Sequence, residues 1–199
     1  MKSMKTLTFI VSMATFSQFG FASLVQGTPS PSLSPVFGVL VNFDDASAGT
    51  ALAANRYAGV GVASISDASN SLGFYSGSQS SPNYVGTGSG AGWAMDTSIL
   101  LSNATNRIGI GIAGPSTLTL TTHNAAGAIG QTYSFTTGFN EYWVIDSAIN
   151  DIASLRIQSS FIAIDDLQFA RTSGAIPEPS TVALIGCGLA ALVLRHRRN

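Results

Sequence analysis

Short apolar and β-branched runs, separated by Gly, Asn, Asp and Ser, fill positions 36–169 of this 199-residue chain and limit what it can fold into. No segment there repeats apolar residues with the 3.6-residue period of an amphipathic helix. Short runs between turn-forming residues are typical of antiparallel strands. The pattern predicts an all-β domain with strands near 37–43, 57–65, 71–76, 93–101, 107–113, 116–122, 129–137, 141–146, 152–158 and 161–169.

Ten short strands with irregular loops favour a two-sheet β-sandwich, of the jelly-roll kind, over a closed barrel. The clearest alternation places Leu118 and Leu120 inward and the threonines between them outward. In the segment 107–112, isoleucine alternates with glycine, so one face is core and the other is bare backbone. That bare face could admit a loop or a ligand, or it could pack against a neighbouring segment. The sequence leaves both alternatives open.

The amino-terminal segment has the pattern of an export signal. Lys2 and Lys5 precede an apolar stretch over 7–21, and Gly20-Phe21-Ala22 places small residues at the two positions that a signal peptidase reads. We therefore predict a signal peptide helix over 1–22 that is removed from the mature protein. The alternative is a retained anchor helix, which the polar residues within the stretch disfavour.

The carboxyl-terminal segment combines prolines, an apolar run and a basic cluster. It consists of Pro177, Glu178, Pro179 and Ser180, the apolar residues 181–194, and then Arg195, Arg197 and Arg198. A helix over the apolar run would be about 20 Å long, short of a hydrocarbon core of about 30 Å, so a buried core helix is an alternative. The prolines before it and the arginines after it favour a transmembrane helix. Basic residues at both chain ends then place both ends in the cytoplasm and the body on the far side of the membrane.

This order of features resembles the PEP-CTERM sorting tail of exopolysaccharide-producing Gram-negative bacteria. The resemblance covers about the last 24 residues. It implies that the Pro-Glu-Pro motif and the arginines are recognised by an exosortase, a membrane protease or transpeptidase that processes the chain near the motif. It also implies an exported protein, anchored briefly in the inner membrane and then delivered to the cell surface or the extracellular matrix.

The composition of the body excludes some partners. Between 23 and 171 there are four arginines and nine acidic residues, a net charge of −5, which argues against a nucleic-acid partner. The only cysteine, Cys187, lies in the tail, so the exported domain has no disulfide. The predicted organisation is a Ser/Pro linker at 23–35, a β-sandwich at 36–171, a linker with the Pro-Glu-Pro motif at 172–180, the transmembrane helix at 181–194 and a basic cytoplasmic tail at 195–199.

Two acidic pairs lie at the two ends of the predicted domain. Asp44 and Asp45 end the first strand, and Asp165 and Asp166 lie in the last. If these strands are neighbours, the four carboxylates could share a structural Ca²⁺ ion, which prefers six to eight oxygen ligands. The alternative is that the first pair caps a turn and the second is solvated at a strand edge.

A second, looser resemblance covers most of 36–169. Phe43-Asp-Asp, Gly49-Thr-Ala-Leu, Tyr57-Ala-Gly-Val, Ser81-Pro-Asn and Ile164-Asp-Asp-Leu-Gln-Phe occur in this order along the chain. Together they resemble jelly-roll domains of many PEP-CTERM and other secreted bacterial proteins, which are similar to galactose-binding-like domains and carbohydrate-binding modules. The resemblance implies sugar binding. Pyranose rings pack on exposed aromatic faces, and the candidates in Gly- and Ser-rich segments are Tyr75, Tyr84 and Trp93.

Catalytic patterns are weak in this chain. The body has one histidine, His123, next to a glycine-containing turn and without the spacing of a zinc site. No Gly-x-Ser-x-Gly nucleophile elbow is present. We therefore expect a protein that is not an enzyme. Two functions fit: a surface or exopolysaccharide-matrix protein that binds carbohydrate, or a purely structural matrix or adhesion protein with no specific ligand.

Overall fold

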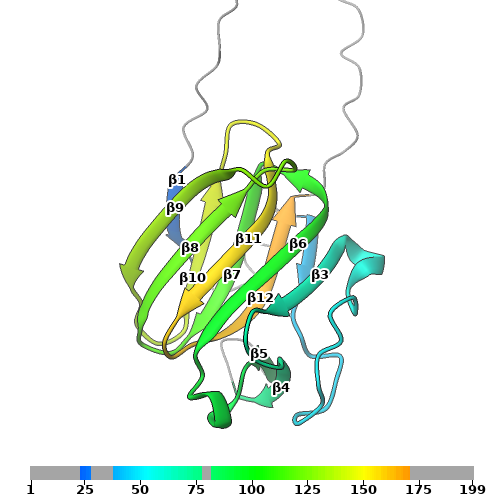
Figure 1. The fold of residues 1–199 in the computed structure, drawn as a ribbon, viewed down its shortest axis with the longest axis vertical. Helices are drawn as coiled ribbons and strands as arrows, with labels where there is room; N and C mark the ends of the chain where they lie inside the picture. Colours follow the sequence, from blue (N-terminus) through cyan, green and yellow to red (C-terminus); the bar gives the residue numbers. More distant parts are fainter. Residues whose placement is uncertain (1–22, 28–37, 78–81, 171–199) are drawn as a thin grey trace, which may run out of the picture.

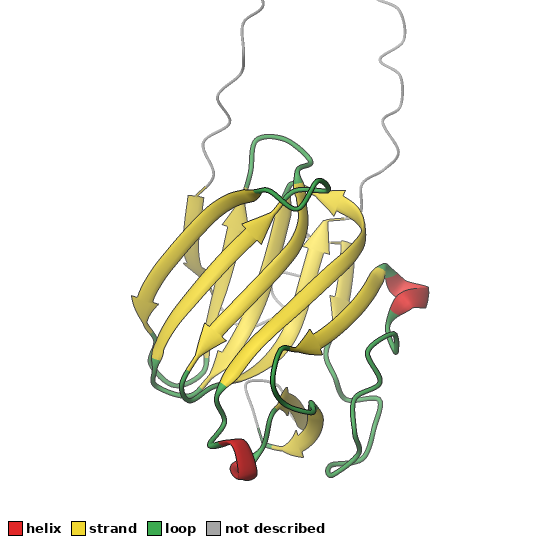
Figure 2. Cartoon of the chain, viewed as in Figure 1, coloured by secondary structure: helices red, strands yellow, loops and turns green. Residues whose placement is uncertain are grey.

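The computed structural model describes residues 23–27, 38–77 and 82–170, which form two antiparallel β-sheets packed face to face (Figure 1). Between the strands, the described residues contain two short 3₁₀ turns, η2 (Ala58–Val60) and η3 (Ser89–Ala91) (Figure 2). The prediction of an all-β, two-sheet sandwich is confirmed. The predicted signal peptide (1–22) and transmembrane helix (181–194) lie outside the described residues.

Within the described residues, no helix is long and apolar enough to cross a membrane.

The larger sheet has seven strands. They are β1 (Ser23–Gly27), β2 (Gly38–Val41), β4 (Gly73–Ser76), β5 (Asn83–Gly86), β7 (Arg107–Ala113), β10 (Glu141–Asp146) and β12 (Ala163–Ala170). Hydrogen bonds connect them in the order β1-β10-β7-β12-β5-β4, and β2 pairs with β12 beside this path.

The smaller sheet has five strands. They are β3 (Val62–Asp67), β6 (Met95–Thr105), β8 (Thr117–His123), β9 (Ile129–Thr136) and β11 (Ile152–Ser159). Their order is β3-β6-β11-β8-β9. The chain passes repeatedly from one sheet to the other, so the ends of strands from both sheets meet at each end of the sandwich (Figure 1).

The core lies between the sheets and follows the alternation of the strands. Ile108, Ile110 and Ile112 of β7 and Leu118 and Leu120 of β8 are almost completely buried, as the pattern predicted. Burying an aliphatic side chain of this size contributes about 1.5 to 3 kcal/mol to stability. A strand of alternating residues therefore becomes stable only when both sheets are present to cover its apolar face.

β12 is the central strand of the larger sheet. Its first half bonds to β5 through Ile164, and its second half bonds to β2 over Leu167–Ala170, on the side away from β7. The register with β7 shifts between Asp165 and Gln168, where Asp166 has a φ of 45°. The bulge lies at the point along β12 where the partner on its other side changes from β5 to β2. β2 and β12 are neighbours, which is the condition under which the two acidic pairs could share an ion.

Three segments differ from the prediction. Ser23–Gly27, assigned to the linker at 23–35, forms β1 and pairs with β10. Residues 57–61, assigned to a strand, form the turn around η2, and β3 begins at Val62. Asn83–Gly86 forms β5, which the sequence did not predict. β1 and β5 have only four or five residues, so their pairing depends on neighbours that are distant in sequence.

The bare glycine face of β7 packs against a side chain. A Cβ atom at Gly109 would lie 2.5 Å from the Tyr142 hydroxyl oxygen and 2.9 Å from a carbon of its ring. Tyr142 is completely buried. At this position the glycine accommodates a neighbouring strand's aromatic ring, which agrees with the second of the two alternatives for this face.

We expect Gly109→Ala to lower the unfolding free energy by about 1 to 3 kcal/mol, because the buried Tyr142 ring has little room to move. Thermal unfolding of the full-length chain in detergent, followed by tryptophan fluorescence, measures this. Gly90→Ala is the matched control, since a Cβ there meets nothing within 4 Å. Equal unfolding temperatures for the two variants would contradict the packing explanation.

Candidate functional site

The three predicted ligand-binding aromatics form one cluster. Tyr75 lies on β4, Tyr84 on β5 and Trp93 just after η3. The Trp93 ring lies 4.8 Å from the Tyr75 ring and 5.7 Å from the Tyr84 ring, measured between centroids. The two tyrosine rings are stacked, with centroids 6.1 Å apart. All three side chains are partly exposed.

Two of these aromatics line an open groove of about 350 Å³. Tyr84 and Trp93 form part of its wall, and Phe139 and Phe161 form another part. The remaining described lining residues are Ser76, Gly77, Ala113, Gly114, Asn140, Ile162 and Ala163. Phe139 is 74% exposed and Phe161 is 47% exposed. Tyr75 does not line the groove and instead supports Trp93 from behind. We call this feature the aromatic groove.

Backbone geometry positions the tryptophan. Trp93 has a φ of 61°, its N–H bonds to the Gly88 carbonyl (3.1 Å), and its carbonyl accepts a bond from the Ile162 N–H (3.0 Å). A Cβ at Gly86 would lie 2.9 Å from the indole ring, so only glycine lets the ring lie against β5. The indole is therefore fixed between β5 and the turn before β12.

Sequence reasoning missed Phe139 and Phe161. Phe161 was assigned to the last strand, but β12 begins at Ala163 and Phe161 lies in the preceding turn. Phe139 lies in the turn between β9 and β10, within Gly138-Phe-Asn140. Both phenylalanines stand among small and polar turn residues. An isolated large apolar residue in a turn was the signal that could have identified them.

The first acidic pair is occupied by local contacts. Asp44 accepts a hydrogen bond from the Asn83 N–H (3.0 Å), which ties the end of the first strand region to β5. Asp45 accepts bonds from Arg56 (3.1 Å) and from the Tyr57 hydroxyl (2.7 Å). Burial and the hydrogen bond to Asp45 raise the pKa of Tyr57 well above its usual value. These aspartates therefore fix the segment between β2 and β3.

The second acidic pair is buried. Asp165 and Asp166 have no exposed surface, and they lie inside the central strand of the larger sheet, so the alternative in which they are solvated at a strand edge is wrong. The Asp166 N–H donates to Asp165 Oδ1 (2.8 Å). Burial raises the pKa of Tyr142, and the Asp166 carboxylate adds to this effect.

In the part of the chain that the structure describes, no group of three or more His, Cys, Asp or Glu residues is arranged to hold a metal ion. The four aspartates thus do not form one such ligand group, although their strands are neighbours. Calcium binding at Asp44, Asp45, Asp165 and Asp166 stays a prediction.

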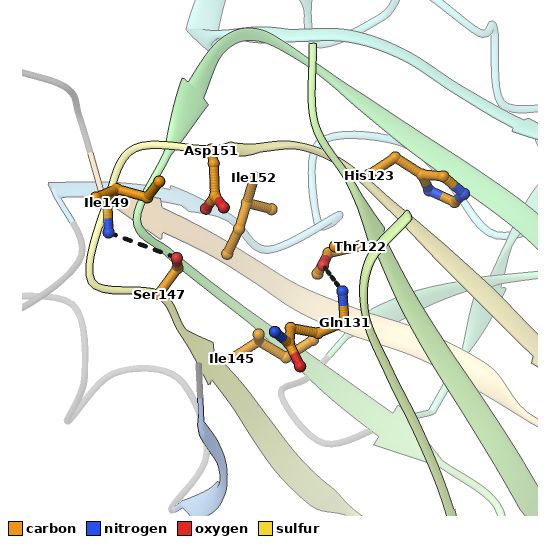
Figure 3. Close-up of a pocket in the computed structure, with 9 residues that line it drawn as sticks. Thr122, His123, Gln131, Ile145, Ser147, Ile149, Asp151 and Ile152 are labelled. Carbon is orange, nitrogen blue, oxygen red and sulfur yellow. Dashed lines mark hydrogen bonds between the residues drawn. The ribbon is translucent and has the colours of Figure 1, made fainter. Parts of the chain in front are cut away.

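A second, smaller cavity lies at the end of the sandwich where β8, β9 and the loop after β10 meet (Figure 3). It has a volume of about 60 Å³, which suits a few water molecules and no sugar ring. The Gln131 N–H bonds to Thr122 Oγ1 (2.9 Å) on its wall. Asp151 Oδ1 is buried there without a hydrogen-bond partner among the described residues. His123, which the sequence placed next to a glycine-containing turn, ends β8 at this cavity and is partly buried.

A polar hollow lies on the smaller sheet, around Asp67, Asp96 and Arg156. Arg156 donates two bonds of 2.7 Å to the Asp96 carboxylate. Asp67 accepts bonds from the Asp96 N–H (2.7 Å) and the Thr97 hydroxyl (2.9 Å). Burial opposes the charged form of Asp67, but these bonds and those from the N–H groups of the following turn lower its pKa overall. Asp67 thus joins β3, β6 and the turn that follows β3.

The lowered pKa of Asp67 predicts a loss of stability in acid. The unfolded-state pKa of an aspartate is about 3.9, so the stabilisation is complete above that value and is lost as the pH falls through the lower folded-state pKa. We expect Asp67→Asn to cost about 1 to 2 kcal/mol at pH 7 and less at pH 3. Chemical denaturation at the two pH values measures this. An equal cost at both would contradict an electrostatic role.

Comparison with known proteins adds a finding outside the described residues. Residues 175–198 match the model of the PEP-CTERM protein-sorting motif, which confirms the resemblance of the carboxyl-terminal segment. The matched span contains Pro177, Glu178, Pro179, Ser180, Arg195, Arg197 and Arg198. No curated protein and no solved structure matches the chain. The β-sandwich therefore has to be interpreted from its own geometry.

Proposed function

We propose that this chain is an exported surface or exopolysaccharide-matrix protein whose β-sandwich binds polysaccharide through the aromatic groove. The sorting motif supports the first part, since it is the kind of tail that an exosortase processes at the inner membrane. Delivery to the surface or the matrix follows from that processing. The groove supports the second part.

The observation that carries the binding proposal is the exposure of Phe139 and Phe161 beside Trp93. Two large apolar side chains in turns, on the wall of a groove of about 350 Å³, are costly to leave in water unless a ligand covers them. Aromatic faces pack against the C–H groups of a pyranose, while the neighbouring Asn140 amide can bond to hydroxyls. An open groove suits a polymer chain better than a small molecule, which a closed pocket would enclose.

The competing function is that of a purely structural matrix or adhesion protein without a specific ligand. In that case the exposed phenylalanines would contact other proteins or nothing. A catalytic role is not part of the proposal, because the described lining residues of the groove include no Asp, Glu, His, Lys or Cys that could act as an acid or base or activate Ser76. The two non-catalytic functions differ in whether the groove residues matter for retention on polysaccharide.

We expect Phe139→Ala and Phe161→Ala each to weaken polysaccharide binding about three- to tenfold, because an aromatic contact contributes about 0.5 to 1.5 kcal/mol. Affinity electrophoresis measures this, using protein recovered from the host and gels that contain the host exopolysaccharide. Ile149→Ala is the matched control: Ile149 is 51% exposed but lies in the loop at the small cavity, away from the aromatic groove.

Equal retardation of the three variants, or no retardation of the wild-type chain, would reject the binding proposal and favour the structural alternative. The phenylalanine variants should unfold at the wild-type temperature, since both side chains are exposed. A lowered unfolding temperature would instead indicate that the phenylalanines stabilise the loops.

The sorting part has its own test. We expect the protein from the host surface to have an intact mass that corresponds to a chain starting at Ser23 and ending near Pro179. In a strain without the exosortase, the carboxyl terminus should extend to Asn199. A full-length carboxyl terminus in both strains would mean that the tail is only an anchor, and delivery to the matrix would be rejected.

A further inference from the structure

The edges of the two sheets are protected to different degrees. The outer edge of β4 is covered by the loop between β2 and β3: the Phe74 N–H donates to the Thr50 carbonyl (2.9 Å) and the Gly49 N–H donates to the Phe74 carbonyl (2.7 Å). At the edge of β3, the Ile65 N–H donates to the Ala54 carbonyl (2.8 Å) of the same loop. β1 and β2 are short, with five and four residues. Covering and shortening are two ways in which proteins prevent edge pairing.

β9 has neither kind of protection among the described residues. It is eight residues long, most of its residues are exposed, and β8 is its only partner among the strands that the structure describes. From Ile129 to Asn140 the sequence contains no charged residue and no proline. A bulge affects its first residues, while Thr132–Thr136 pairs regularly with β8. An uncharged, regular edge of this kind is a template for another strand.

The outward hydrogen-bonding groups of β9 can be assigned from its inward bonds. The Gln131 N–H bonds to Thr122 Oγ1, and the Thr137 N–H bonds to the Ser116 carbonyl, both at 2.9 Å and both toward β8. Because inward and outward bonds alternate along an antiparallel strand, the backbone groups of Thr132, Ser134 and Thr136 point away from the sheet. They form a regular row of donors and acceptors.

We propose that β9 is a self-association edge, which pairs antiparallel with β9 of a second copy about a two-fold axis at Ser134. The two-fold axis makes the second β9 run antiparallel to the first. The outward N–H and C=O groups then alternate in opposite order on the two strands, so each donor on one strand faces an acceptor on the other. The absence of charge on β9 means that no like charges face each other across the axis. Two five-stranded sheets would join into one of ten strands.

This pairing has a consequence for the aromatic groove. Phe139 follows β9 directly, so the two grooves of a pair would lie near opposite ends of the joined strands. A pair could then hold two polysaccharide segments, and its retention would exceed that of one groove. The pairing itself does not depend on the proposed function and can be present without any ligand.

The test uses the chain in a host strain without the exosortase, so that it keeps its tail and stays in the membrane, with Cys187→Ser as the background. Adding Ser134→Cys places a thiol opposite its own copy, at a Cα separation of about 5.5 Å that a disulfide spans. Thr117→Cys is the matched control: Thr117 is exposed on the same face of β8, one strand further in. Thr117 is opposite Thr136, so its two copies would lie about three strand spacings (about 14 Å) apart across the strands and about four residues (about 13 Å) apart along them, too far for a disulfide. Membranes are treated with copper–phenanthroline and analysed on non-reducing gels.

We expect disulfide-linked dimers with Ser134→Cys and at least fivefold fewer with Thr117→Cys. A chain with Thr132→Cys and Thr136→Cys, which face each other across the same axis, should also cross-link. Adding Thr132→Lys and Thr136→Lys to the Ser134→Cys chain should reduce dimers at least fivefold, because like charges then face each other. Absence of dimers from both cysteine chains, or equal yields from Ser134→Cys and Thr117→Cys, would overturn the proposal.

Discussion

Hydrogen bonding along β12 is the constraint on which the larger sheet depends. This strand bonds to β7 on one side and to both β2 and β5 on the other, so it joins segments from the start, the middle and the end of the domain. All but the last of its residues are buried. Such contacts join residues that are distant in sequence. The entropy of closing the loops between them is lost before the contacts contribute to stability. The bulge at Asp166 lies where the partner on one side of β12 changes from β5 to β2.

The aromatic groove is a product of this arrangement. Its described wall comes from six separate parts of the chain: β4, β5, the turn after η3, the turn after β7, the turn after β9 and the turn before β12. Antiparallel strands that alternate between two sheets return all these turns to one end of the sandwich (Figure 1). Loops on a rigid scaffold are free to vary in sequence, which is why binding residues concentrate there.

The sequence pattern predicted those strands whose residues alternate or favour β-structure by themselves. The bounds of β7 and β10 match the expectation, because Ile108, Ile110 and Ile112 alternate without interruption and Glu141–Asp146 is rich in β-forming residues. The sequence did not predict β5, because Tyr84 and Val85 alone are too few residues to show an alternating pattern. This strand forms through its pairing with β4 and β12. Clustering of Tyr75, Tyr84 and Trp93 could be suspected from exposed aromatics. Their convergence with Phe139 and Phe161 depends on topology, which no local window contains.

The geometry of the groove and that of β9 both favour retention through several weak contacts. An open groove with a few aromatic contacts leaves much of a ligand in water, so under the proposed function a single site would hold polysaccharide weakly. A polymer presents many equivalent sites, and a protein that carries two grooves gains retention through effective concentration without any new contact. An unprotected edge strand is a hazard in a protein that must stay monomeric. In a matrix protein the same edge would convert weak single contacts into stable cross-links, so a binding role and a structural role need not exclude each other.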